Sequence, residues 1–318
     1  MKYIDIPAYD GTLIHTSRIA MGSTMSMEGL NNDEKWALYD YYVDRGGNCI
    51  DTARSYGRGH AEEMVGEYMR LRKNRNRLII STKGGHPTDE NPGVSRVTKK
   101  DILADLETSL SKLGTDYVDY YWIHKDDASV PAEELADIIS EIVRQGKARR
   151  VGVSNFTTER IAAIDAAAAA SDGYGVGASQ IQWSLPATED KYFAQFDSLV
   201  MTPKRYDYYL KNNIPVFAFS SQAQGFFARV EAQGLDAQPE GLREQYGSAD
   251  NMKRFEKVKA MAAEKNTSVS AIGLAYIINN RLPGAAIIGS QSIDMLSQSL
   301  DAADVEMTAE EADELYRV

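Results

Sequence analysis

Four side chains that can donate, accept or stabilise protons follow short apolar runs along the chain. Asp51 and Tyr56 lie in "NCIDTARSY", Lys83 ends "LIISTK", and His124 ends "YVDYYWIH". A tyrosine with its ordinary pKa near 10 donates a proton poorly at neutral pH unless its phenolate is stabilised. A lysine ammonium beside the phenol provides that stabilisation, an aspartate keeps the lysine charged, and a histidine can orient a substrate oxygen. Together the four residues predict acid/base chemistry.

Each of these residues also has an ordinary structural interpretation. Asp51 could cap the helix that follows it, Lys83 could be a solvated loop charge, and His124 could be a hydrogen-bonded core residue. Their joint placement favours chemistry, because side chains at the ends of neighbouring parallel strands converge on one site. The functional interpretation therefore depends on the elements that carry them.

Eight short apolar runs alternate with segments of helical periodicity. The helical pattern is clearest in residues 131–147, where apolar side chains recur three and four positions apart, and in residues 98–114, where Thr98 and Gly114 mark the two ends. Parallel strands need such crossover helices, and eight strand–helix units close into a (β/α)8 barrel, the TIM barrel. The strand-like runs cover residues 19–23, 48–53, 78–83, 117–124, 150–155, 178–184, 215–221 and 285–290.

The alternative α/β fold is a doubly wound open sheet. Its dinucleotide fingerprint, GxGxxG after the first strand, is missing from this sequence. We therefore expect residues 1–318 to form a single (β/α)8 barrel domain. A turn at Asp10–Gly11 predicts an N-terminal β-hairpin that closes the barrel floor. Insertions at 184–203 and 222–250 are expected to be long loops at the C-terminal face.

The barrel would place its active site at the C-terminal ends of the strands. Polar or small residues end nearly every predicted strand, so this face of the barrel would be rich in hydrogen-bonding groups. Besides the four residues above, they are Gly22, Ser23, Ser154, Asn155, Gln180, Ser220, Ser221 and Ser290.

Composition limits the kinds of partner and the cellular compartment that we expect. The formal net charge is −11 and no basic run stands out, which argues against nucleic acid. Cys49 is the only cysteine, and the four histidines lack the spacing of metal ligands. No apolar run reaches the length of a membrane span, and the N-terminus lacks the pattern of a signal peptide. We expect a soluble cytoplasmic protein without a metal site.

The chain resembles the aldo-keto reductase family. The similar segments are "CIDTARSYGRGHAEEMVGE", "LIISTKGG", "DYVDYYWIHK" and "GKARRVGVSNFT", in the same order and spacing as in the family. The resemblance implies that Tyr56 is the general acid in the reduction of an aldehyde or ketone, with a sugar or another small carbonyl compound as a candidate substrate. Lys83 and Asp51 would tune Tyr56, and His124 would orient the carbonyl group.

The resemblance also implies a nicotinamide cofactor and the residues that bind it. Ser154, Asn155 and Gln180 would hold the nicotinamide carboxamide, and Phe219 would stack on the ring where a tyrosine is common. The remaining implied contacts are Gly22, Ser23 and Asp51 near the nicotinamide, Ser220, Ser221 and the loop through Gly225 around the pyrophosphate, and Ser290, Gln291, Gln298 and Ser299 at the adenosine end.

The adenosine end departs from the family pattern. Ser290 and Gln291 stand where a basic residue that pairs with the 2′-phosphate is expected, and Met295 replaces a frequent arginine. An arginine–phosphate clamp is among the stronger polar contacts, so its absence weakens the preference for NADP. We expect NADP(H) on family grounds, with NAD(H) as the alternative.

The substrate pocket is less clearly marked. Arg54 and Arg58 flank Tyr56 and could attract an anionic substrate, but pairing with nearby acidic residues is favoured. Trp122 is expected to alternate outward into the helix layer, Trp183 is the better pocket candidate, and the loop at 222–250 could close over the cofactor. The remaining candidates for the wall are Met25, Tyr56, Phe226, Phe227 and Tyr246.

Three other functions are compatible with parts of the sequence. A cofactor-binding regulatory subunit with little turnover would use the same barrel, and an NAD-dependent alcohol or sugar dehydrogenase would run the reaction in the oxidative direction. A metal-dependent barrel hydrolase would need a cluster of His and carboxylate ligands at the strand ends, where only Asp51 and His124 stand. The complete set of Asp51, Tyr56, Lys83 and His124 favours a reductase that acts on a small-molecule carbonyl compound.

Overall fold

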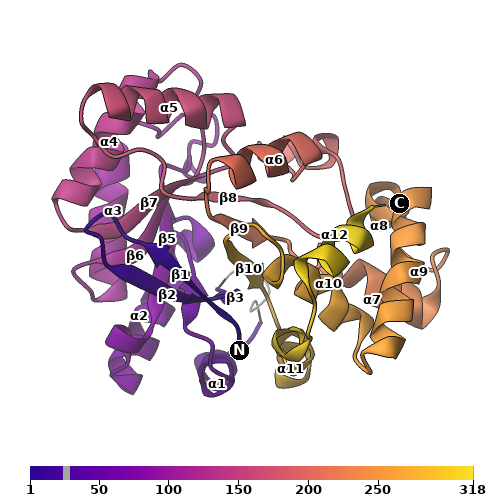
Figure 1. Ribbon diagram of the computed structural model, residues 1–318. Coiled ribbons are helices and arrows are strands. Elements are labelled where there is room, and N and C mark those ends of the chain that lie inside the picture. The colour runs from indigo at the N-terminus through magenta and orange to yellow at the C-terminus, as the bar shows by residue number, and fades with distance from the viewer. Residues whose placement is uncertain (24–28, 318) are drawn as a thin grey trace.

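Eight parallel strands form a closed barrel in the computed structural model, which describes residues 1–23 and 29–317 (Figure 1). Each strand pairs with its neighbours in chain order, and the last pairs with the first. The predicted barrel and all eight predicted strands are confirmed. The strands are β3 (Ile19–Gly22), β4 (Cys49–Asp51), β5 (Ile79–Gly84), β6 (Val118–Ile123), β7 (Ala148–Ser154), β8 (Ser179–Gln182), β9 (Val216–Phe219) and β10 (Gly284–Ile288).

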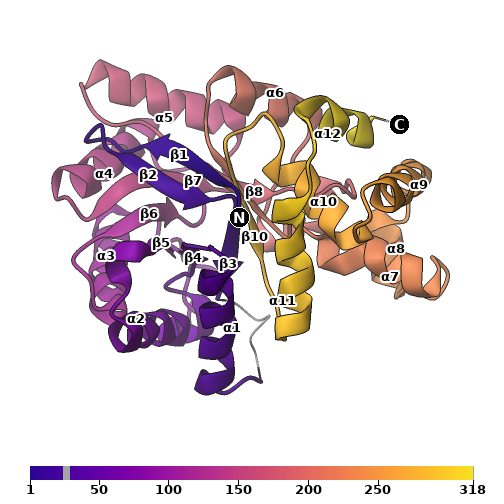
Figure 2. The ribbon, with the colours of Figure 1, turned by 60° about the horizontal axis from the view of Figure 1, so that its bottom comes forward.

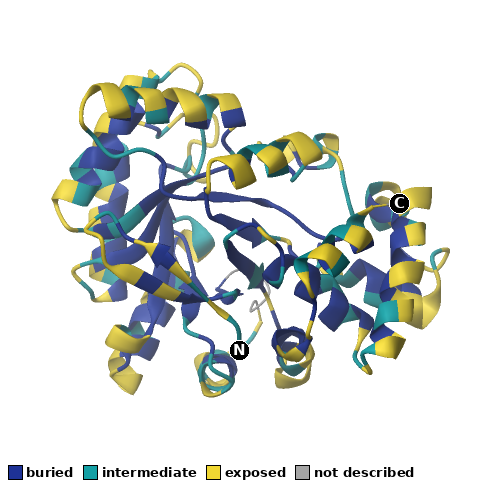
Figure 3. Cartoon of the chain, viewed as in Figure 1, coloured by how far each residue is buried: buried dark blue, intermediate teal, exposed yellow. Residues whose placement is uncertain are grey.

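Helices surround the barrel, with buried faces toward the strands and exposed faces outward (Figure 3). The predicted ends of one helix are confirmed, because the Thr98 side chain accepts from the Asp101 amide and Gly114 follows the helix with φ 65°. The helices are α1 (Asn32–Asp44), α2 (His60–Arg72), α3 (Lys99–Leu113), α4 (Ala132–Arg144), α5 (Thr158–Ala170), α6 (Pro203–Lys211), α7 (Phe226–Gln233), α8 (Glu240–Tyr246), α9 (Ala249–Glu264), α10 (Val269–Ile278), α11 (Ile293–Leu300) and α12 (Ala309–Tyr316).

An antiparallel hairpin closes one end of the barrel, as predicted. It consists of β1 (Tyr3–Pro7) and β2 (Leu13–Ser17) and lies across the strands in Figure 2. Ile6 and Ile14 on the hairpin are buried in one apolar cluster with Tyr120 and Phe217 of the barrel interior. This packing shuts the N-terminal end of the barrel and leaves the opposite end for a ligand.

The segment at 222–250 is not the loop that its composition predicted. It contains α7 and α8, and the side chains of Phe226, Phe227 and Tyr246 are buried. The ring of Phe226 lies 5.9 Å from that of Phe227 and 5.6 Å from that of Tyr246. These aromatic residues are therefore core, and none of them lines the large cavity at the C-terminal ends of the strands. Within the described residues, no helix combines the length and apolarity needed to cross a membrane.

Trp122 is buried, but it does not point into the helix layer. It belongs to the apolar cluster inside the barrel, where its ring stacks 5.9 Å from that of Tyr120. The reason is the strand period of two residues: Trp122 stands two positions before His124, so both side chains point to the same face. The predicted outward orientation is wrong.

Candidate active site

A cavity of about 940 Å³ lies at the C-terminal ends of the barrel strands. Ser23 and Lys83 are buried and are not among the residues that line it. The predicted residues that line it are Gly22, Asp51, Tyr56, His124, Ser154, Asn155, Gln180, Phe219, Ser220, Ser221, Gly225, Ser290, Gln291, Gln298 and Ser299.

Asp51 and Lys83 form a buried ion pair beneath this cavity. Lys83 Nζ donates to Asp51 Oδ2 at 2.6 Å and to the backbone oxygen of Thr52 at 2.7 Å. Burial alone would lower the pKa of the Lys83 ammonium, but attraction to Asp51 and Tyr56 outweighs it and the pKa is raised. The lysine is therefore held charged beside the phenol.

Tyr56 is placed over this lysine by a tight turn. The Lys83 ammonium lies 4.7 Å from the centre of the Tyr56 ring. The backbone after Tyr56 is left-handed at Gly57, Arg58 and Gly59, with φ of 55°, 57° and 88°, and this strained turn leads directly into α2. Burial raises the pKa of Tyr56, Lys83 opposes that rise and Asp51 adds to it. The phenol thus keeps its proton at neutral pH.

His124 faces Tyr56 across the cavity. The two rings are 5.9 Å apart and nearly perpendicular, and the ring of His86 lies 5.0 Å from His124. Burial, and then the charges of Lys83, His86 and Lys125, hold the pKa of His124 well below its usual range, so the imidazole is neutral. Its Nδ1 atom is buried without a hydrogen-bond partner among the described residues.

Hydrogen-bonding groups line the next part of the cavity, at the ends of β7 and β8. Asn155 has a left-handed backbone, with φ 62°, and its Nδ2 donates to Ser154 Oγ at 3.1 Å. Asn155 Oδ1 accepts from the Leu199 amide at 3.1 Å, which holds the 184–203 segment at the cavity edge. Gln180 Nε2 donates to Asp51 Oδ1 at 3.2 Å. The predicted nicotinamide-binding residues are thus brought together next to the acid/base group.

A strained loop after β9 continues the cavity wall. Its backbone is left-handed at Ser220, Ala223, Gln224 and Gly225, with φ of 48°, 48°, 56° and 74°. Such turns point successive amide hydrogens into one concave space, which suits an anion. Arg229 on α7 lies next to this loop, with Nε donating to the Gln224 oxygen at 3.0 Å. Among the described residues that line the cavity, Arg229 is the only arginine or lysine.

The far end of the cavity is polar and uncharged. Gln222 Nε2 donates to Ser299 Oγ at 3.1 Å, and Ser290 is 1% exposed with its Oγ unpartnered among the described residues. An unpartnered buried hydroxyl at a cavity wall suits a polar ligand. The loop through Gly225, with Gln222 and Gln224, and Met295 at the adenosine end also line the cavity. The lining residues that the sequence interpretation did not include are Ser198, Ala228, Arg229, Ser270, Ile287, Ile288 and Gly289. Arg229 lies four residues after Gly225, and this helical spacing is the sequence feature that predicts its place beside the loop.

Residues 18–318 match the family model of the aldo/keto reductases. The chain belongs to the aldo/keto reductase family. Aldo/keto reductases are oxidoreductases that use nicotinamide cofactors, which agrees with a polar cavity leading to a buried acid/base group.

Several curated proteins are similar to this aldo/keto reductase. A Saccharomyces cerevisiae protein provisionally named an aryl-alcohol dehydrogenase is 27% identical over 305 residues, which cover 92% of this chain and 78% of that protein. The aldo-keto reductase YhdN of Bacillus subtilis is 36% identical over 166 residues, covering 51% and 49% of the two chains. The norsolorinic acid reductase of Aspergillus flavus is 25% identical over 301 residues, covering 87% and 69%.

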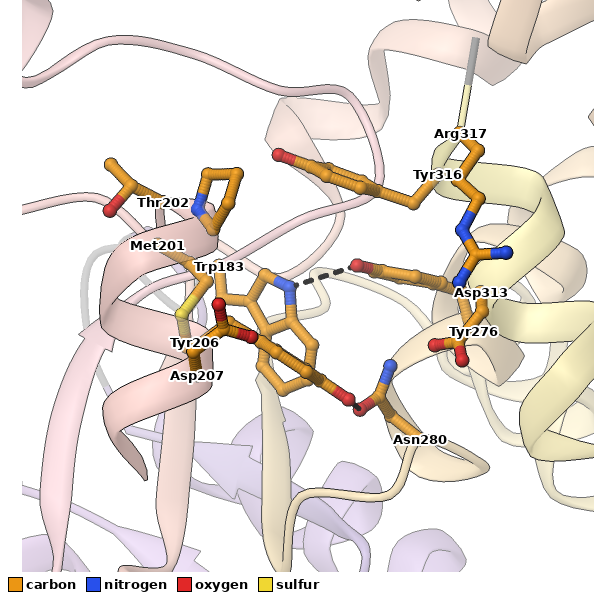
Figure 4. A pocket seen from close by; sticks show the side chains of 11 residues that line it. Trp183, Met201, Thr202, Tyr206, Asp207, Tyr276, Asn280, Asp313, Tyr316 and Arg317 are labelled. Atoms are coloured by element: carbon orange, nitrogen blue, oxygen red, sulfur yellow. Dashed lines mark hydrogen bonds between the residues drawn. The ribbon is translucent and has the colours of Figure 1, made fainter. Parts of the chain in front are cut away.

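Trp183 of this aldo/keto reductase is not in the wall of the large cavity. It lines a separate pocket of about 180 Å³, between residues of α6, α10 and α12 (Figure 4). The Trp183 Nε1 group donates to the Tyr276 hydroxyl at 3.3 Å, and Tyr206 packs edge-on against the indole. The prediction that Trp183 is a pocket residue of the active site is therefore wrong.

The other substrate-pocket predictions have mixed outcomes. Tyr56 lines the large cavity, whereas Met25 lies outside the described residues. Arg58 pairs with Asp89 at 2.9 Å, so the favoured interpretation of that arginine is confirmed. Within the described residues, no group of three or more His, Cys, Asp or Glu side chains could hold a metal ion.

Proposed function

We propose that this aldo/keto reductase reduces an aldehyde or ketone to the alcohol, with Tyr56 as the proton donor. The arrangement of Tyr56 over the buried Lys83–Asp51 pair carries the proposal. A protonated phenol in a cavity, with an ammonium fixed beneath it, can release its proton and keep the resulting phenolate stable.

Each residue of the group has a separate role in the proposed reaction. The bound nicotinamide cofactor supplies the hydride. Tyr56 gives its proton to the carbonyl oxygen, and the Lys83 ammonium stabilises the phenolate that remains. His124 is neutral, and with Nδ1 as the unprotonated nitrogen its Nε2 hydrogen is available to the carbonyl oxygen. Asp51 keeps Lys83 charged and in place.

The cavity fits a nicotinamide dinucleotide along its length. Ser154, Asn155 and the amide oxygen of Gln180 would hold the carboxamide, because the Gln180 Nε2 group is used by Asp51. Phe219, which lines the cavity, would stack on the ring. The left-handed loop at 220–225 and Arg229 would meet the pyrophosphate. Gly22 and Ser23 would approach the nicotinamide end.

We propose NADP(H) as the preferred cofactor, with a smaller preference over NAD(H) than a basic clamp would give. The adenosine end would be held by Ser290, Gln291, Gln298 and Ser299, which carry no charge. The first turn of α11, which follows Ser292, offers amide groups and a positive helix end to a 2′-phosphate. NAD(H) remains the alternative.

The oxidative direction is the second candidate. A relative provisionally named an aryl-alcohol dehydrogenase supports it, because the same residues can take a proton from an alcohol when the cofactor is oxidised. Assays with alcohols and oxidised cofactor, beside assays with carbonyls and reduced cofactor, distinguish the preferred direction.

The proposed function is tested by following the loss of reduced-cofactor absorbance with a panel of aldehydes and ketones. We expect Tyr56→Phe to reduce kcat by about a hundredfold to ten-thousandfold. Tyr206→Phe is the matched control, because the Tyr206 hydroxyl bonds Asn280 at the separate pocket. Equal rates for the parent and Tyr56→Phe would refute the assignment, and tight cofactor binding without turnover of any carbonyl would favour a regulatory subunit.

A further inference from the structure

Asp51 receives hydrogen bonds from below as well as from Lys83. Ser81 Oγ donates to Asp51 Oδ1 at 2.8 Å, and Trp122 Nε1 donates to Ser81 Oγ at 2.6 Å. Ser81 and Trp122 are both 0% exposed and lie inside the barrel. Trp122, Ser81 and Asp51 form a hydrogen-bonded chain, the Trp122–Ser81–Asp51 network. Asp51 lines the cavity, whereas Ser81 and Trp122 lie behind its wall.

Strand geometry explains why the network exists. Ser81 and Lys83 are two residues apart on β5, and Trp122 and His124 are two residues apart along β6 and its end, so each pair points to the barrel interior. In the register of the sheet, Asp51 is opposite Ser81, and Lys83 is opposite Trp122. The same faces that present Lys83 and His124 to the site thus carry Ser81 and Trp122 one layer below.

The direction of the hydrogen bonds is determined by chemistry. An indole nitrogen can only donate, so Ser81 Oγ must accept from Trp122. The serine proton is then left for Asp51 Oδ1, which is the only acceptor that Ser81 Oγ contacts within the described residues. Trp122 therefore orients the Ser81 hydroxyl, and the Ser81 hydroxyl orients the carboxylate.

We propose that Ser81 and Trp122 are positioning residues of the acid/base site: they fix the carboxylate of Asp51 so that it holds the Lys83 ammonium against Tyr56. Without this support, Gln180 is the only other side chain bonded to Oδ1 in the part of the chain that the structure describes, and its Nε2 contact is longer, at 3.2 Å. A carboxylate that turns away no longer holds the Lys83 ammonium against Tyr56, and the phenolate then loses more stabilisation from Lys83 than it gains from weaker repulsion by Asp51. This inference rests on the proposed proton transfer from Tyr56.

Other ionisable groups face the same residues. Lys83 from β5, Tyr56 from the turn after β4, and Cys49 from β4 surround Asp51, while His124 from the end of β6 faces Tyr56. His86 lies behind His124. Burial raises the pKa of the Cys49 thiol and lowers that of His124, so both are neutral near pH 7. A change at Ser81 therefore acts on the alkaline titration through Lys83 and Tyr56.

The kinetic test compares the pH dependence of kcat for carbonyl reduction. Reduction requires protonated Tyr56, so kcat declines at alkaline pH as Tyr56 loses its proton. A less stabilised phenolate raises the pKa of Tyr56 and moves this decline to higher pH. We expect Ser81→Ala and Trp122→Phe to shift this decline upward by about half a pH unit or more, and to lower kcat about tenfold with KM changed less than about twofold. Ser81→Thr keeps the hydroxyl and should restore the parent profile.

Tyr120→Phe is the matched control for these variants. Its hydroxyl contacts Thr16 Oγ1 at 3.2 Å, and its ring stacks on Trp122. The change therefore removes a buried polar group from the same cluster, keeps the stacked ring and leaves the hydrogen bonds of the network unchanged. If Ser81 and Trp122 have a purely structural role, Tyr120→Phe should show kinetics similar to those of Ser81→Ala and Trp122→Phe. An equal shift in Tyr120→Phe, or no shift in Ser81→Ala and Trp122→Phe, would overturn the proposal.

A measurement without turnover separates this inference from the proposed function. The chain has three tryptophans, so nitrogen-15 labelling gives three indole N–H signals, and that of Trp122 is identified by its loss in Trp122→Phe. We expect Asp51→Asn to move the Trp122 signal and leave those of Trp36 and Trp183 in place. An unmoved Trp122 signal refutes the network even if the enzyme is active. A moved signal in a protein that reduces no carbonyl supports the network and rejects the proposed function.

Discussion

Gln180 Nε2 donates to Asp51 Oδ1 across 3.2 Å, which connects the predicted nicotinamide contact with the carboxylate that holds Lys83. A change in Gln180 should therefore affect both cofactor binding and proton transfer.

We expect Gln180→Met, which keeps the length of the side chain and removes its amide, to raise the Kd for the cofactor about tenfold and to lower kcat. Fluorescence titration with reduced cofactor measures the first effect and steady-state kinetics the second. Gln182→Met is the control, because Gln182 is buried on the same strand but bonds Ser184 outside the cavity. Equal effects of the two variants would contradict the assigned role.

Breaking the buried ion pair should destabilise the fold. Asp51→Asn leaves the Lys83 ammonium without its carboxylate at a site that is 0% exposed, and we expect the free energy of unfolding to fall by about 3 kcal/mol. Lys83→Met leaves the opposite unpaired charge and should have a similar cost. Urea unfolding of the cofactor-free protein measures both.

The double variant Asp51→Asn with Lys83→Met tests whether the cost comes from the unpaired charge. Since neither charge is then left alone, we expect it to lose clearly less stability than the sum of the single variants. Additive losses would show that the pair contributes through packing and not through charge.

The sequence predicted the barrel and its strand ends because their signals are local. Asp51, Lys83 and Gln180 each lie at or near the end of a short buried strand, and parallel pairing brings such ends to one face whatever the details of the helices. Most of the predicted contacts therefore line one cavity.

The wrong predictions concern side chains whose direction is set by tertiary packing or by the two-residue period of a strand. Trp183 follows β8 directly, but its side chain packs against Tyr206 on α6 and Tyr276 on α10. No local sequence pattern predicts these contacts. Phe226 and Phe227 lie in a segment whose polar composition predicts a loop, whereas packing against Tyr246 and Phe255 buries them. Trp122 stands two residues before His124, and this spacing alone places its side chain inside the barrel.

His124 should make the fold less stable in acid. Above about pH 6.5 neither the folded nor the unfolded protein carries a proton on this residue, so it contributes nothing to the pH dependence. Below that pH the unfolded chain gains the proton, whereas the folded protein resists it because burial and nearby Lys83 hold the pKa of His124 well below 6.5. The free energy of unfolding should then fall by up to about 1.4 kcal/mol per pH unit.

Between about pH 7.5 and about pH 5.5 the free energy of unfolding should fall in both proteins. We expect the fall in His124→Gln to be smaller than that in the parent by roughly 1 kcal/mol, as measured by urea unfolding. His60→Gln is the control, because the His60 side chain is 82% exposed. If the parent and His124→Gln lose the same stability, the imidazole is not held neutral by the fold.

One added positive charge at the adenosine end should increase the preference for NADPH over NADH. Gln291 is exposed, lines the cavity and stands where the family pattern has a basic residue. We expect Gln291→Arg to tighten NADPH binding about tenfold while changing NADH binding little, because only NADPH carries the 2′-phosphate that an arginine can pair with. Fluorescence titrations with the two cofactors give the ratio. Gln233→Arg makes the same change of net charge at an exposed position of α7 away from the cavity lining. A similar gain in that variant, or equal gains for both cofactors, would place the 2′-phosphate elsewhere.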